Sequence, residues 1–213
     1  PFAQTGLVDG VQRLDVRAAD TAGNVGAVAA STWTVDTQAP DVAITAVSGR
    51  YSNKTSDSFT VTASETVTYQ CRLDTGSWAN CSPPMVVANA TEGDHTVSIR
   101  ATDRAGNTTT SAYTWTTDRT APVVTIPEPD AVSNQTTVSM TFTVDETTNS
   151  ECRITGGTWA ACSSPAAFSG LREGSQTFSV RATDRAGNVH TKSISWTLDL
   201  TDRKSTRLNS SHV

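Results

Sequence analysis

The sequence repeats itself with a period of 81 residues, and this repetition constrains the fold more than any other feature. The segment VSIRATDRAGN at 97–107 returns as FSVRATDRAGN at 178–188, and LDVRAADTAGN at 14–24 is a third, shorter copy. Around these segments, Trp78, Trp115 and Asp118 recur as Trp159, Trp196 and Asp199. A fixed period of this kind indicates an array of similar structural units.

The repeats divide the chain into four segments. We expect the C-terminal part of a truncated repeat at 1–39, complete repeats at 40–121 and 122–200, and a tail at 201–213. The tail matches neither repeat, so we expect it to be disordered or artefactual. The linkers DTQAP (36–40) and DRTAP (118–122) are short and contain proline, which predicts stiff connections.

Apolar and polar residues alternate within each repeat, a pattern typical of half-buried strands, and no segment has helical periodicity. Inward-facing triplets include Val97, Ile99 and Ala101, and the last strands place Trp33, Trp115 and Trp196 inward as core residues. In the first complete repeat we expect seven strands, near 41–47, 57–63, 67–73, 78–81, 85–88, 95–102 and 111–117. The sequence therefore predicts an all-β fold of tandem immunoglobulin-like β-sandwich repeats, arranged as beads on a rod.

The four cysteines form two pairs with identical spacing, Cys71 with Cys81 and Cys152 with Cys162. Turn residues lie between them, so a hairpin that folds about Gly76 sets Cys71 opposite Cys81. Two matched pairs favour structural disulfides over a redox-active site, and disulfides indicate an exported protein that is secreted or displayed at the cell surface.

Composition excludes several classes of function. The net charge of −5 leaves no basic surplus for nucleic acid, and no apolar stretch is long enough to insert into a membrane. No nucleophile, phosphate-binding or metalloprotease motif is present, so we expect no enzyme activity. His95 aligns with Gln12 and Gln176, which suggests an ordinary exposed strand position.

The pattern CRLDTGSWANCS, followed by EGDHTVSIRATDRAGN and by WTTDRTAP, resembles the tandem bacterial immunoglobulin-like repeats. The resemblance covers residues 1–200. It implies a large secreted or cell-surface repetitive protein, with the repeats acting as a stalk or adhesin, and some repeats of this kind bind calcium. The expected partners are neighbouring repeats in the same chain, together with a cell-surface protein or glycan.

Tracing the strand directions brings acidic residues together at each repeat junction. The first set is Asp36, Glu65, Asp103 and Asn107, and the second is Asp118, Glu146, Asp184 and Asn188. Calcium prefers such oxygen ligands, whereas soft ligands for zinc or copper are absent. The alternative is structural, because D-R-A-G-N also has the residues of a hairpin turn.

Two tryptophans, Trp78 and Trp159, have the parity opposite to the cysteines, which allows Arg72 and Arg153 to stack on them. We expect packing at the hairpin, with sugar binding as the alternative. The sequence thus favours a non-catalytic structural or adhesive stalk, with a carbohydrate-binding or accessory module of a secreted hydrolase as the rival interpretation.

Overall fold

The computed structural model describes residues 3–201, and its regular elements are all strands, which confirms the all-β class. Contacts divide the chain into two compact units, one formed by residues up to 50 with 55–116 and the other by residues 51–54 with those from 117 onward. The tail predicted at 201–213 lies, except for Thr201, outside the described residues.

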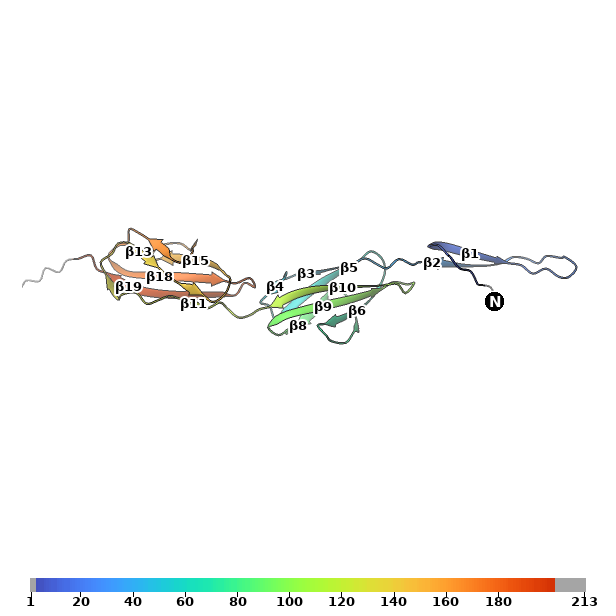
Figure 1. Cartoon of the computed structure of the whole chain (residues 1–213), viewed down its shortest axis with the longest axis horizontal. Coiled ribbons are helices and arrows are strands. Elements are labelled where there is room, and N and C mark those ends of the chain that lie inside the picture. The colour runs from blue at the N-terminus through green and yellow to red at the C-terminus, as the bar shows by residue number, and fades with distance from the viewer. Residues whose placement is uncertain (1–2, 202–213) are drawn as a thin grey trace, which may run out of the picture. The chain divides into compact units, whose positions relative to one another are not determined.

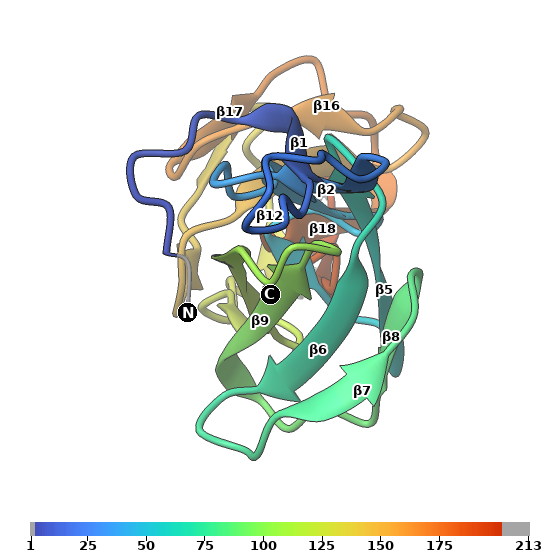
Figure 2. The same cartoon turned by 90° about the vertical axis from the view of Figure 1, so that its right-hand side faces the viewer.

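The first complete repeat contains two sheets. The smaller has the order β3-β5-β8, formed by Val42–Ala46, Ser56–Ala63 and Met85–Ala88. The larger runs from β10 (Thr108–Thr117) through β9 (Gly93–Thr102) and β6 (Thr68–Leu73) to β7 (Ala79–Cys81), as Figure 2 shows for the last three. All seven predicted strands are present, and the two-residue β4 (Tyr51–Ser52) extends the larger sheet beside β10.

The second complete repeat has a similar arrangement, with shorter strands on its smaller side. Its larger sheet has the order β12-β19-β18-β15-β16, formed by Val132–Ser133, Val189–Leu198, Gly174–Thr183, Asn149–Ile154 and Ala160–Ala161. Strands β18 and β19 run side by side through this repeat (Figure 1). The opposite side consists of the pairs β11-β14 (Val124–Thr125, Thr143–Val144) and β13-β17 (Val138–Met140, Ala166–Phe168).

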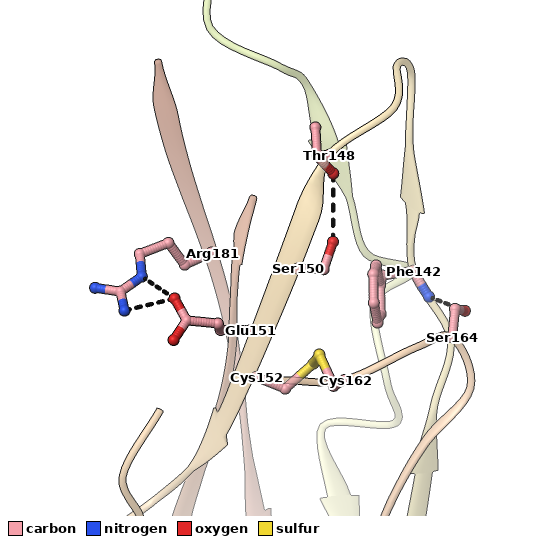
Figure 3. Close-up of a disulfide and its surroundings, with 8 residues drawn as sticks. All are labelled: Phe142, Thr148, Ser150, Glu151, Cys152, Cys162, Ser164 and Arg181. Carbon is pink, nitrogen blue, oxygen red and sulfur yellow. Dashed lines mark hydrogen bonds and ion pairs between the residues drawn. A yellow bond between two sulfur atoms is a disulfide. The ribbon is translucent and has the colours of Figure 1, made fainter. Parts of the chain in front are cut away.

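The smaller side of the sandwich is less continuous in the second complete repeat. The counterpart of β5 is interrupted between β13 and β14, where the backbone N–H of Phe142 donates to the hydroxyl of Ser164 at 2.9 Å (Figure 3). A side chain thus replaces the neighbouring strand as hydrogen-bond acceptor, so one long strand becomes two short ones.

The alternating residues form the core of each repeat. Val97, Ile99 and Phe59 are fully buried in the first, and Phe178 and Val180 are fully buried in the second. Trp115 and Trp196 are also buried, as their parity predicts, and Trp115 packs against Phe59 with ring centroids 4.7 Å apart. Each complete repeat therefore has a core built from its own strands.

The N-terminal segment forms a separate two-stranded sheet of β1 (Gly10–Val16) and β2 (Ala29–Val35). Trp33 on β2 is only half-buried, so its predicted place in a core is wrong for this segment. The reason is that no second sheet covers this hairpin among the described residues, whereas Trp115 lies between two sheets.

The linker prolines are part of the packed structure. Pro40 and Pro122 are both fully buried, although each was predicted from sequence only as a stiffening residue. Each linker therefore ends inside the repeat that follows it.

Both disulfides are present, Cys71–Cys81 and Cys152–Cys162, with Cα–Cα distances of 5.8 and 5.7 Å. The predicted register is wrong, however, because Cys71 pairs with Ala79 and Tyr69 pairs with Cys81. The bridge therefore crosses the hairpin diagonally, and a diagonal neighbour remains within disulfide reach.

Candidate functional site

Three carboxylates meet at the start of each complete repeat. The first acidic cluster is Asp36, Glu65 and Asp103, and the second acidic cluster is Asp118, Glu146 and Asp184. In each cluster, one oxygen from every residue lies within 4.8 Å of the others. Three separate segments supply them: the linker, the turn after β5 or β14, and the turn between the two long strands. The juxtaposition inferred from strand direction is thus present.

The innermost carboxylate of each cluster also shapes its own turn. Asp103 is buried, and its Oδ1 accepts the backbone N–H groups of Gly106 and Asn107 at 2.7 and 2.9 Å. Gly106 has φ of 98°, which a residue with a side chain rarely adopts. Burial tends to raise the pKa of Asp103, but the bonds from Asn107 and the turn amides hold it below its ordinary value.

The asparagines of the predicted metal sites present nitrogen to the carboxylates. The Nδ2 of Asn107 donates to Asp103 Oδ2 at 2.8 Å and to the backbone carbonyl of Asp36 at 3.0 Å. Asn188 makes the same two bonds to Asp184 and to Asp118, both at 2.8 Å. Each asparagine therefore ties the turn to the linker as a hydrogen-bond donor.

The N-terminal segment contains a closely similar turn. Asp20 accepts hydrogen bonds from the backbone N–H groups of Ala22 and Asn24 and from the Nδ2 of Asn24, so the alanine amide takes the place that the glycine amide has in the complete repeats. The linker aspartates have a similar role, because Asp36 and Asp118 each accept the N–H two residues later. Turn and linker geometry therefore explain the aspartates of both clusters.

Glu65 and Glu146 are different, since both are exposed and no such local bond explains them. The pKa of Glu65 is raised by desolvation and then by the charges of Asp103 and Asp36. The pKa of Glu146 is also raised by desolvation first and then by neighbouring charges, among which that of Asp184 has the largest effect. Each glutamate thus adds a third negative charge where two carboxylates already lie close, an arrangement that a bound cation would stabilise.

Both hairpin tryptophans stack against two arginines. The guanidinium carbons of Arg72 and Arg100 are 4.7 and 4.4 Å from the ring centre of Trp78. Trp159 has the equivalent neighbours, Arg153 and Arg181, at 4.5 and 4.7 Å. The stacking predicted for one arginine per repeat is present, and a second arginine from the neighbouring strand joins it.

His95 was predicted to be exposed, and this prediction is wrong. The residue is 8% exposed, its ring centre lies 5.4 Å from that of Trp115, and its Nδ1 is 2.9 Å from Asp74 Oδ2. Position 95 shares the inward parity of Val97 and Ile99, which was the available signal.

The surface depressions of the complete repeats are shallow features of hairpins and strand edges. One is lined by Arg153, the turn Thr155–Gly157 and hydroxyls of β18, and another by residues of β6, β7 and Thr102. Neither is lined by a carboxylate or an imidazole. Within residues 3–201, no helix is long and apolar enough to cross a membrane.

Parts of the chain match two protein-family models. Residues 43–119 match the model "Bacterial Ig-like domain", and residues 85–155 match "Bacterial Ig-like domain (group 3)". No curated protein matches the sequence.

Solved structures with a similar arrangement include the fibronectin(III)-like modules of Clostridium thermocellum CbhA, at 15% identity and a TM-score of 0.47, covering 80% of this chain and 99% of that one. A tetra-tandem repeat in the extending region of a large adhesion protein is 22% identical, with a TM-score of 0.33 and coverage of 92% and 58%. A Ca²⁺-stabilised adhesin with which an Antarctic bacterium binds ice is 19% identical, with a TM-score of 0.34 and coverage of 88% and 56%. All three TM-scores lie below 0.5, so these likenesses do not bear on the function of this chain.

Proposed function

We propose that this chain, which is built of bacterial immunoglobulin-like repeats, is a non-catalytic spacer segment of a secreted or cell-surface protein. The observation that supports this function most is that each complete repeat buries its own core and closes its own disulfide. Such units fold with little help from distant parts of the chain, so they can be added in series to set a length. Disulfides in small domains also fit an oxidising, extracellular compartment.

A spacer requires that damage to one repeat stays within that repeat. Trp115→Ala and Trp196→Ala are matched lesions at equivalent core positions, and each is expected to cost about 3–5 kcal/mol. Calorimetry of the full chain should show that each variant lowers the transition of its own repeat and leaves the other within a degree or two. If either lesion unfolds both repeats together, they form one cooperative domain and the spacer proposal is wrong.

The more specific part of the proposal is that the acidic clusters bind calcium. We infer that the first acidic cluster binds one ion between the linker and the first complete repeat, and that the second acidic cluster does so for the second. The ligands would be carboxylate oxygens of Asp36, Glu65 and Asp103, or of Asp118, Glu146 and Asp184, completed by backbone oxygens and water. Asn107 and Asn188 would hold the turns in place as donors. The ion would fix each linker against the repeat that it enters.

The glutamates test this proposal because their turns do not need them. Without calcium, Glu146→Gln should raise the melting temperature of the second repeat, since it removes repulsion from Asp184 and Asp118. With calcium at a hundred times its dissociation constant, the unsubstituted repeat should gain about 2.7 kcal/mol, and the variant should gain much less.

Glu128→Gln, an exposed residue of the same repeat, is the matched control and should leave the calcium response unchanged. Melting and titration calorimetry, with calcium and with chelator, measure both effects. If calcium changes neither signal in the unsubstituted chain, the clusters are turn and linker residues only.

A further inference from the structure

We propose that the outer face of the larger sheet in the first complete repeat binds an acidic polysaccharide whose sugars bear carboxylates. We call this surface, formed by Gln70, Arg72, Trp78, Asn80 and Arg100, the Trp78 face. The proposal does not depend on the spacer function, because it concerns the solvent side of one sheet.

Strand register places these side chains together. Gln70 pairs with Arg100 across β6 and β9, and Arg72 follows two residues later on the same side. The intervening residues, Cys71 and Ile99, point into the core and are buried. The arginines therefore point outward beside each other, and Trp78, from the hairpin that follows β6, lies against both.

The two positive charges of this face have no carboxylate partner. Among residues 3–201, neither Arg72 nor Arg100 makes a salt bridge, and the Nε of Arg72 is buried without a hydrogen-bond partner. Trp78 covers both guanidiniums and shields them partly from water, which makes them more attractive to an anion than solvated lysines. The forked N–H groups of arginine match the two oxygens of a carboxylate.

Polar groups suited to sugar hydroxyls extend from the arginines. A shallow depression beside them is lined by Thr68, Gln70, Asn80, Ser82 and Thr102. Gln70 belongs to both features, and its Nε2 lies 3.4 Å from Asn80 Oδ1. Amides and hydroxyls both donate and accept hydrogen bonds, as sugar hydroxyls require, and the indole supplies apolar surface for the C–H side of a ring. An aromatic ring, two cations and a polar trough in one line fit an acidic polysaccharide.

The second complete repeat is a natural control, because one of the two arginines on the same face is paired there with a carboxylate. Position 70 is matched by Glu151, whose Oε2 accepts hydrogen bonds from Arg181 Nε at 2.9 Å and Nη2 at 2.6 Å (Figure 3). Asn80 is matched by Ala161, which has no polar side chain. This repeat retains Trp159 and its two arginines, so it isolates the effect of the carboxylate and the lost amide.

The test uses the full chain, labelled with ¹⁵N, and follows the indole N–H signals during titration with an oligomer of galacturonic acid at low salt. The Trp78 signal should move saturably and the Trp159 signal should not. Gln70→Glu should weaken binding at least tenfold, because the new carboxylate would pair with Arg100 as Glu151 pairs with Arg181. The double change Glu151→Gln with Ala161→Asn should make the Trp159 signal respond.

Arg104→Gln controls for net charge, since it removes one charge from an exposed turn residue outside the Trp78 face and should weaken binding less than twofold. A neutral glucose oligomer of the same length should leave the Trp78 signal unmoved. The proposal is overturned if the acidic oligomer gives no saturable shift, if the neutral one binds equally well, or if Arg104→Gln weakens binding as much as Gln70→Glu. Failure of the double change to move the Trp159 signal also overturns it.

Discussion

One side chain at the same position of every repeat donates to the backbone carbonyl four residues earlier. Gln12 does so to Val8 at 2.9 Å and Gln176 to Arg172 at 2.6 Å, while His95 Nε2 lies 2.9 Å from the Thr91 carbonyl. A carbonyl only accepts, and so does the ionised Asp74 carboxylate at Nδ1, so both ring nitrogens of His95 must donate. The contacts therefore suit a protonated imidazolium.

This pair predicts a pH dependence for the first complete repeat. The bond to Asp74 holds the pKa of His95 above its ordinary 6.5, against the opposing effect of burial, with the Thr91 carbonyl and the Asp94 charge adding to it. The stabilisation is therefore complete below pH 6.5 and is lost as pH rises through the raised pKa. Asp74 has a lowered pKa, so its contribution is lost only in acid, as pH falls below its ordinary 3.8.

Between about pH 6 and pH 9, the first complete repeat should lose on the order of 1 kcal/mol, or several degrees of melting temperature. His95→Gln should remove this contribution, because the glutamine would reproduce the bond that Gln176 makes to Arg172. Melting curves of both proteins across this range measure the effect. Equal pH slopes in the two proteins would contradict the assignment.

At this scale the sequence predicted the core well and the polar exceptions poorly. Alternation placed Val97 and Ile99 correctly because apolar burial follows strand parity. The same parity points His95 inward, but its polarity led to the opposite interpretation. Its partner Asp74 is 21 residues away, and only the pairing of β6 with β9 brings the two together.

The disulfide hairpin is the element whose contribution can be measured most cleanly. Replacing Cys152 and Cys162 together by serine should destabilise the second complete repeat by about 2.5–3 kcal/mol, because the unfolded chain regains the freedom of a short loop. Its melting temperature should fall by roughly 10–20 °C. The first complete repeat keeps the Cys71–Cys81 disulfide and serves as the internal reference, so its melting temperature should not change.

Replacing Cys71 and Cys81 together by serine should lower the melting temperature of the first complete repeat and leave that of the second unchanged. Calorimetry of the two variants, with intact and reduced parent proteins, separates the contributions. A shift in both transitions from one pair of substitutions would show that the hairpins are not local staples.

Strand positions followed from the sequence, whereas their pairing details did not. The seven expected strands are present because alternation and turn residues mark them. The diagonal offset of Cys71 and Cys81 was missed, because equal spacing about a turn does not fix the register. The split of β13 from β14 depends on the Ser164 hydroxyl, a contact between segments for which the sequence has no local signal.

At the scale of the whole chain, the repeat topology predicted correctly that the three segments of each acidic cluster lie together. The sequence could not decide between turn and ligand, because Asp103 has the geometry of a turn former in either case. Asp20 makes a closely similar turn in the N-terminal segment, so this aspartate has a structural role in all three copies. Glu65 and Glu146 are thus the residues that distinguish a calcium site from a turn.

The central claim is that the complete repeats are independent, disulfide-stapled units in a spacer. Pulling single molecules by the two ends of the full chain tests it most directly. We expect two successive unfolding events of equal length, each releasing roughly 200–250 Å of chain, with the loop behind each disulfide held back. Added reductant should lengthen each event by about 35 Å, the extended length of that loop. A single event for both repeats, or extension without resisting events, would contradict the account.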